Sequence, residues 1–98
     1  MTDIPEAALH AVIEGRVQGV GFRYFVLEQA QNLALTGWVR NRERGEVEVY
    51  AEGSQDALEP FLRQLERGPG MAYVSHVTVE WPAATGKFTK FSIAPTDW

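Results

Sequence analysis

The fold is decided by the central stretch of the chain, which reads TGWVRNRERGEVEVYA at residues 36–51. Residues 36–41 predict one β-strand, and the clean alternation of polar and apolar residues over 46–51 predicts a second. The short polar segment 42–45 between them ends in glycine and suits a hairpin connection. A tight hairpin in the middle of the chain argues against a fully parallel, doubly wound sheet.

Apolar residues recur at strand or helix spacing on both sides of this hairpin. An alternation that starts at Leu9 predicts a strand, while stripes at helical spacing start at Phe22 and Leu58. Ser54 is a good N-cap for the second helix, and Pro60 is expected to loosen or kink its first turn. The expected elements are, in order, a strand over 8–14, a helix over 22–35, strands over 36–41 and 46–51, a helix from the cap at Ser54 to the Gly68-Pro69-Gly70 stop, a strand over 73–81 and a short last strand around Phe91 and Ile93.

This order of elements matches the split β-α-β plan. The expected fold class is therefore α+β: a ferredoxin-like sandwich with a mostly antiparallel sheet and both helices packed on one face. Residues 1–98 are expected to form a single domain, with residues 1–7 as a flexible lead. The same plan carries RNA-binding and ligand-sensing domains, so the fold alone leaves the function open.

The loop between the first strand and the first helix has the composition of an anion cradle. It reads GRVQGVGFR at residues 15–23. Its glycines permit the positive φ angles that turn backbone N–H groups toward one point, and the helix N-terminus beyond adds unpaired N–H groups. Arg23 supplies a planar guanidinium whose N–H groups can donate to a phosphate. No acidic residue lies between Glu14 and Glu28, so the loop is locally positive. Loop chemistry alone fits an anion site or a plain tight connection equally well, because the spacing is neither a dinucleotide nor a Walker fingerprint.

Composition excludes several other classes of function. The chain has no cysteine, which excludes disulfides and thiolate zinc sites. His10 and His76 lack the spacing of metal ligands, and no metal or other cofactor is expected. The formal net charge of −4 argues against nucleic acid as a partner. No apolar run is long enough to span a membrane, and acids stand where a signal peptide carries positive charge, so a cytoplasmic protein without a membrane partner is expected.

Arg23 and Asn41 are expected to lie at the same edge of the sheet. In a split β-α-β unit the first two strands run the same way, so the glycine loop and the end of strand 36–41 meet. The plain alternatives are a surface arginine on a helix and a turn asparagine at a strand end. The residues predicted at this edge include no metal ligands, no activated nucleophile and no paired carboxylates. Such a site suits an already activated substrate, such as an acyl phosphate, that needs positioning and charge stabilisation.

Two segments, GRVQGVGFR at 15–23 and GWVRN at 37–41, resemble the signature segments of the acylphosphatase family, and the resemblance covers nearly the whole chain. It implies the ferredoxin-like fold and an enzyme that hydrolyses the carboxyl–phosphate bond of acyl phosphates. The products would be a carboxylate and inorganic phosphate, with no cofactor and no covalent intermediate.

The resemblance also implies roles for particular residues. Arg23 would clamp the phosphoryl oxygens, and the side-chain amide of Asn41 would orient the attacking water. Inorganic phosphate would be both product and competitor, and the fold needs no partner chain, so a monomer is expected. The residues expected to bind the phosphate are Gln18, Gly19, Val20, Gly21, Phe22 and Arg23.

Two places in the chain depart from the family pattern. Gly21 stands where some vertebrate members carry cysteine, and its backbone N–H still serves the loop. Ala94 and Pro95 follow the terminal Phe-x-Ile, where many members carry a basic or aromatic residue, which bears on the end of the last strand. Neither departure touches Arg23 or Asn41.

Three other functions fit parts of the pattern. A nucleic-acid module would use Tyr50 and Trp81 on the open sheet face, but glutamates accompany them on the same strands. A ligand-sensing domain would bind phosphate without turnover. The third is the acylphosphatase-like module of larger carbamoyl-transferring maturation proteins, although the chain ends shortly after the fold is complete. No residues form an obvious acyl pocket: Trp38, Tyr73 and Trp81 could line one, but core or sheet packing is the more common role of such side chains.

Overall fold

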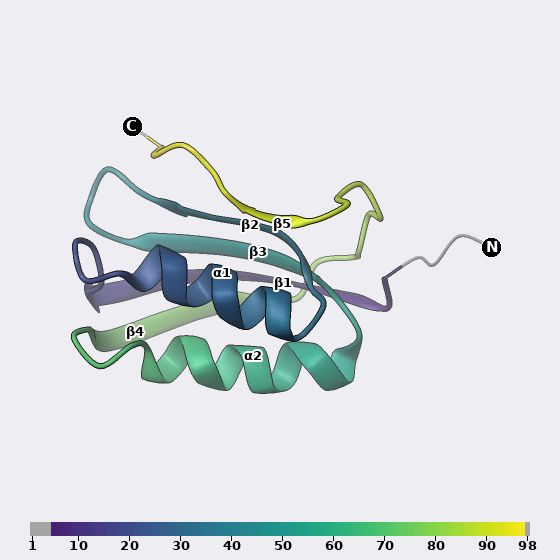
Figure 1. The fold of residues 1–98 in the computed structure, drawn as a ribbon, viewed down its shortest axis with the longest axis horizontal. Helices are drawn as coiled ribbons and strands as arrows, with labels where there is room; N and C mark the ends of the chain where they lie inside the picture. Colours follow the sequence, from purple (N-terminus) through teal and green to yellow (C-terminus); the bar gives the residue numbers. More distant parts are fainter. Residues whose placement is uncertain (1–4, 98) are drawn as a thin grey trace.

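The computed structural model describes residues 5–97, and its helices and strands follow one another in the predicted order (Figure 1). The prediction of a helix or strand in each segment is therefore confirmed. The elements are β1 (Ala7–Arg16), α1 (Phe22–Asn32), β2 (Thr36–Asn41), β3 (Val47–Gly53), α2 (Gln55–Arg67), β4 (Tyr73–Glu80) and β5 (Phe91–Ile93).

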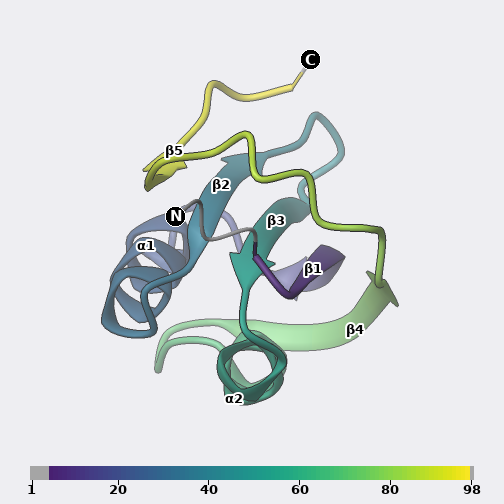
Figure 2. The same ribbon diagram turned by 90° about the vertical axis from the view of Figure 1, so that its right-hand side faces the viewer.

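The strands form one sheet in the order β4-β1-β3-β2-β5. Neighbouring strands are antiparallel except for β2 and β5, which run parallel. Both helices pack on the same face of the sheet (Figure 2). The expected class, a ferredoxin-like α+β sandwich with a mostly antiparallel sheet, is confirmed.

The hydrophobic core lies between the sheet and the two helices. The apolar residues that alternate along β1 and β3 and the central residues of both helical stripes are fully buried, whereas Val77 and Val79 of β4, also expected to face inward, are only partly buried. Burial removes apolar surface from water and contributes roughly 1.5–3 kcal/mol for each large side chain. The fully buried core residues include Leu9, Ala11, Ile13, Phe22, Val26, Ala30, Val47, Val49, Ala51, Leu58, Phe61 and Leu65.

A β-bulge at the end of β1 aims the chain into the glycine loop. The register with β4 shifts between Glu14 and Gly15, and Gly15 has a φ of 133°. A Cβ atom at this position would lie 2.1 Å from the carbonyl oxygen of Tyr73, so only glycine fits. The bulge lets β1 continue to Arg16, two residues beyond the predicted end at Glu14.

Helix α1 ends at Asn32, three residues before the predicted Leu35. The chain leaves the helix through a Schellman turn, in which the Leu35 N–H donates to Ala30 O and the Ala34 N–H donates to Gln31 O. Ala34 has a φ of 57° in this turn. The helical stripe continues past the turn because Leu35 is still buried, and periodicity alone therefore overestimates the length of the helix.

Helix α2 starts at the predicted N-cap. The Ser54 hydroxyl accepts a hydrogen bond from the Ala57 N–H at 3.1 Å, and the helix runs unbroken through Pro60 to Arg67. Its first-turn bonds to the Ser54 carbonyl are formed at 3.0–3.1 Å. The predicted helix is confirmed, and the cap holds the turn in which Pro60 was expected to cause loosening.

The predicted lead of residues 1–7 is too long. Ala7 already belongs to β1, and the Glu6 carboxylate accepts a hydrogen bond from the Gln55 N–H, at the start of α2, at 2.7 Å. Residues 1–4 lie outside the described part of the chain. The carboxylate lies at the positive end of the α2 dipole, which favours this contact.

Candidate active site

The glycine loop and the β2–β3 hairpin lie at the same end of the molecule (Figure 1). Between them is a small cavity of about 120 Å³. The prediction that Arg23 and Asn41 meet at one edge of the sheet is confirmed, because both line this cavity. The other lining residues are Val17, Gly19, Gly21, Phe22 and Tyr24.

The loop conformation depends on two glycines with positive φ. Gly19 has a φ of 73°, and Gly21, the N-cap of α1, has a φ of 78°. A Cβ atom at either position would meet nothing within 4 Å, so glycine is required here by the backbone conformation and not by crowding. The first N–H groups of α1 follow directly, and its first turn contains no acidic residue. This end of the loop therefore presents unpaired donors and the positive end of a helix dipole.

Gln18 has a structural role that the sequence did not reveal. It was expected among the phosphate-binding residues, and in the structure its side-chain amide reaches across to the hairpin. The Gln18 Nε2 donates to the carbonyl oxygens of Arg42 at 2.8 Å and Glu46 at 2.9 Å. The glycine loop is thereby fastened to the hairpin that follows Asn41. The only signal in the sequence is a long amide side chain among glycines.

Asn41 is held by its backbone while its side-chain acceptor is free. It pairs with Val47 across the hairpin, and its carbonyl oxygen accepts a hydrogen bond from the Asp97 N–H at 3.0 Å. Its Oδ1 is buried and has no hydrogen-bond partner. Within residues 5–97 the only other buried side-chain oxygen in this condition is Oγ1 of Thr36, at the opposite end of β2.

Strand alternation explains why Asn41 faces the cavity. Val39 on the same face of β2 is fully buried under the helices, whereas Trp38 and Arg40 lie on the opposite face. There the Trp38 and Tyr50 rings stack with their centroids 6.1 Å apart, and the Arg40 guanidinium lies 4.8 Å from the Trp38 ring. Asn41 therefore lies on the helix-covered face of β2 and lines the cavity together with residues at the start of α1.

A polar network supports the opposite face of the hairpin. The Glu48 carboxylate bonds to His10 Nε2 at 2.6 Å and accepts from Arg40 Nε at 2.8 Å. Burial raises the pKa of Glu48, but these hydrogen bonds lower it more, so the pKa lies below its usual 4.5. Arg42 and Asp97 extend the network, with their charged groups 3.8 Å apart. The chain after Ile93 thus stays beside β2 despite its departure from the family pattern.

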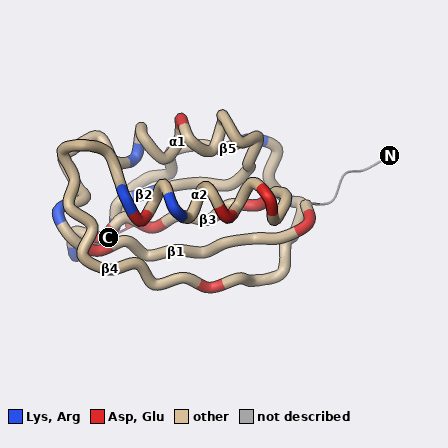
Figure 3. The backbone as a smooth tube through the Cα atoms, turned by 90° about the horizontal axis from the view of Figure 1, so that it is seen from below, with Lys and Arg blue, Asp and Glu red and all other residues tan. Residues whose placement is uncertain are grey.

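The charge around the cavity favours an anion. Figure 3 shows basic residues gathered at the end of the molecule that carries the glycine loop and the hairpin. The arginines near Asn41 already have acidic neighbours, Glu48 beside Arg40 and Glu46 beside Arg42. In the described part of the chain no carboxylate lies within 4.0 Å of the Arg23 guanidinium.

The described part of the chain shows neither a metal cluster nor a membrane-spanning helix. Between residues 5 and 97 no group of three or more acidic or histidine side chains is placed to hold a metal ion. None of the described helices combines the length and apolar character needed to cross a membrane.

The family model and the curated relatives point to one family. The family model described as Acylphosphatase matches residues 9–93. An acylphosphatase of Bacillus licheniformis is 47% identical over 83 residues, which cover 85% of this chain and 92% of that protein.

Solved structures show the same likeness. The crystal structure of acylphosphatase from Bacillus subtilis is similar with a TM-score of 0.87 and 39% identity, covering 90% of this chain and 98% of that one. For an acylphosphatase from Coxiella burnetii the TM-score is 0.88 and the identity 36%, covering 96% of this chain and 100% of that one. The resemblance seen in the two sequence segments is confirmed over the length of the fold, and the chain belongs to the acylphosphatase family.

Proposed function

We propose that this member of the acylphosphatase family hydrolyses small-molecule acyl phosphates in the cavity between the glycine loop and Asn41. Water adds to phosphorus, and the bond between phosphorus and the bridging oxygen breaks. An acyl phosphate dianion and one water give a carboxylate and a dihydrogen phosphate anion, so atoms and charge balance. The water supplies both protons of the released phosphate.

The phosphate is held by the loop and by Arg23. Backbone N–H groups from Gln18 to Phe22 surround the phosphoryl oxygens, and the Arg23 guanidinium neutralises part of their charge. The support for this assignment is the left-handed conformation of Gly19 and Gly21, the start of α1 beside them, and an arginine without a carboxylate partner in the described residues. These donors are fixed before the substrate arrives, so they lower the energy of the developing charge without rearranging.

The observation that carries the proposal is the unpartnered Oδ1 of Asn41. A buried acceptor without a donor costs roughly 1–3 kcal/mol, and folded proteins retain such groups where a ligand completes them. A water molecule that donates to this oxygen would be held beside the phosphate and oriented for attack. Neither a carboxyl nor an imidazole lines the cavity, but the leaving carboxylate needs no proton, so positioning accounts for the chemistry.

The wider setting of the enzyme is also part of the proposal. We expect it to act as a cytoplasmic monomer, without a cofactor and without a nucleic-acid or membrane partner. The open sheet face supports this for nucleic acids, because Glu48 and Glu52 place buried carboxylates beside its aromatic residues. Inorganic phosphate, which fits the same cradle, should compete with the substrate.

The test is hydrolysis of benzoyl phosphate and acetyl phosphate, with inorganic phosphate as competitor. Arg23→Ala should abolish nearly all activity, because it removes phosphate binding and charge stabilisation together. Asn41→Ala should lower kcat about 10²–10³-fold while the inhibition constant of phosphate changes little, by analogy with the loss of one positioned group. Arg63→Ala, an exposed arginine on α2, is the matched control and should behave as the unmodified protein.

Two outcomes would contradict the proposal. Phosphate binding without any turnover by the unmodified protein would leave a ligand-binding domain in its place. An Asn41→Ala variant that works at the parental rate would remove the water-positioning role of Asn41.

A further inference from the structure

A second hollow lies beside the phosphate cavity, on the outer surface of α1. Its volume is about 410 Å³, and it is bordered by Tyr24, Phe25, Leu27, Glu28 and Gln31. Tyr24 belongs to both hollows, since it also lines the cavity that contains Arg23 and Asn41. Tyr24 therefore borders both spaces.

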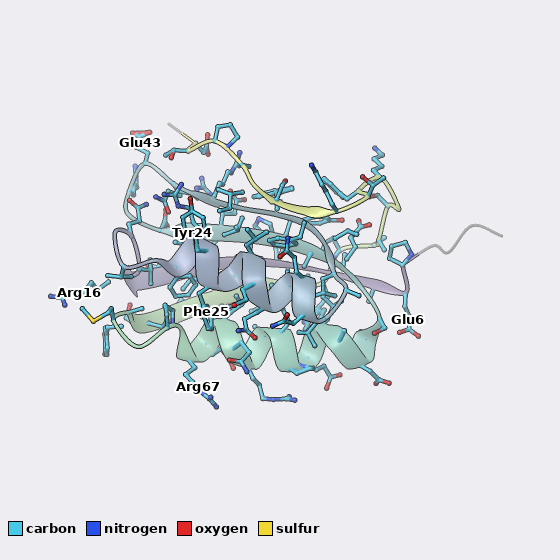
Figure 4. The ribbon with its side chains drawn as sticks, in the orientation of Figure 1. Glu6, Arg16, Tyr24, Phe25, Glu43 and Arg67 are labelled. Atoms are coloured by element: carbon cyan, nitrogen blue, oxygen red, sulfur yellow. The ribbon has the colours of Figure 1, made fainter. Side chains whose placement is uncertain are left out.

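Tyr24 marks the opening of the phosphate cavity. Val17 and Phe22 are 1% exposed and close the cavity from inside, while Arg23 and Asn41 are assigned to phosphate and water. Tyr24 is 69% exposed, and it lies at the N-terminal end of α1 in Figure 4. The acyl group of a bound substrate must leave the cavity away from the attacking water, because attacking and leaving oxygens stand in line in phosphoryl transfer. Among the side chains that line the cavity, Tyr24 is the one that remains to contact the acyl group.

The chemistry of the hollow indicates which acyl groups it accepts. Phe25 and Leu27 pack against the core and offer apolar surface beside the Tyr24 ring. Glu28, four residues after Tyr24, lies on the same side of the helix and is the only charged residue that borders the hollow. An aromatic or aliphatic acyl group gains contact with the ring, whereas an acyl group with a second carboxylate meets the charge of Glu28.

We propose that the acyl group of the substrate lies on the outer surface of α1 against Tyr24, and that Tyr24 and Glu28 select uncharged apolar or aromatic acyl groups over anionic ones. This rests on the proposed function, because it places the acyl group relative to a phosphate in the loop. It assigns specificity to two residues that take no part in the bond-breaking step.

The test compares substrates that share the phosphate and differ in the acyl group. Tyr24→Ala should lower the ratio of kcat/KM for benzoyl phosphate to that for acetyl phosphate about 3–10-fold, the range expected for one aromatic contact. Tyr24→Phe should keep the parental ratio, since the ring is retained. Tyr73→Ala is the matched control: this tyrosine is 68% exposed on β4, lines neither hollow and should leave both substrates unchanged.

Glu28→Gln tests the effect of the Glu28 charge separately from the Tyr24 ring. It should raise kcat/KM for succinyl phosphate relative to acetyl phosphate about 2–5-fold at low salt, and the gain should shrink as salt screens the exposed charge. An unchanged benzoyl-to-acetyl ratio in Tyr24→Ala, with normal inhibition by phosphate, would overturn the inference and leave the proposed function standing. Absence of turnover of all these substrates by the unmodified protein would instead overturn the proposed function, and this inference with it.

Discussion

The side chains of Asn41 and Glu52 bury polar groups at opposite ends of the β2–β3 pair. The carboxylate of Glu52 has hydrogen-bond partners, whereas the Oδ1 of Asn41 has none. Glu52 is 1% exposed, and its carboxylate accepts from Thr85 N and Oγ1 at 2.8 Å, from Gly86 N at 2.9 Å and from the Tyr50 hydroxyl. The Oδ1 of Asn41 accepts from nothing. The two groups show how the same physics serves stability at one place and function at another.

The Glu52 end holds a long connection in place. Residues 81–90 join β4 to β5 across the sheet and contain no helix or strand (Figure 1). The backbone N–H groups of Thr85 and Gly86 donate to the buried carboxylate of Glu52 instead of to the backbone of a neighbouring strand. Satisfied buried polar groups of this kind fix a unique conformation. An unsatisfied group next to an open cavity is instead available to a ligand.

The sharpest test of this comparison measures how much each of the two groups contributes to stability. Glu52→Ala should lower the free energy of unfolding by about 2–4 kcal/mol, because several buried donors lose their acceptor. Asn41→Ala should change it by no more than about 0.5 kcal/mol, because no hydrogen bond is lost. Urea unfolding measures both, and the comparison breaks if Asn41→Ala is the more destabilising of the two.

Gln18→Ala tests the hydrogen bonds that connect the glycine loop to the β2–β3 hairpin. Loss of the bonds to Arg42 and Glu46 should cost about 1 kcal/mol of unfolding free energy and lower kcat/KM about tenfold, since the loop and Asn41 are then less well positioned. Gln55→Ala, whose exposed amide bonds to Glu59 at 3.2 Å, is the matched control and should leave activity unchanged. Equal losses in both variants would show that the Gln18 contacts do not position the site.

The smallest expected effect is a pH dependence of stability that belongs to the Glu52 end. Burial raises the pKa of Glu52, but hydrogen bonds from Tyr50, Thr85 and Gly86 lower it more, so it lies below its usual 4.5 when the protein is folded. Its contribution to stability is complete above pH 4.5 and is lost as the pH falls through the folded pKa. In Glu52→Gln the fall in unfolding free energy below pH 4.5 should be shallower than in the parent.

Tyr50 provides the alkaline counterpart of the same measurement. Burial, and then the hydrogen bond to Glu52, raise the pKa of Tyr50 from 10.0 to about 12. Its contribution to stability is complete below pH 10 and is lost as the pH rises through about 12. Tyr50→Phe should remove this alkaline loss, and an unchanged loss between these pH values would contradict its assignment to Tyr50.

The parts that the sequence predicted well depend on local patterns. The bounds of β2 were predicted without error, and its end at Asn41 is set by the polar hairpin segment that follows. The roles of Arg23 and Asn41 remain predictions, although the cavity brings them together. The end of α1 was misplaced because Ala34 adopts a conformation usually reserved for glycine, and no residue type announces it.

The sequence by itself determined the order of elements, the faces of the strands and the glycine loop before α1, because alternation and glycine placement act over a few residues. Only the tertiary structure decided which polar groups find partners. Gln18 bonds to a carbonyl 24 residues away, and Glu52 bonds to a backbone N–H 33 residues away. Whether a buried group is satisfied depends on what the fold brings beside it, and the unpartnered oxygen of Asn41 is visible only once every neighbour is in place.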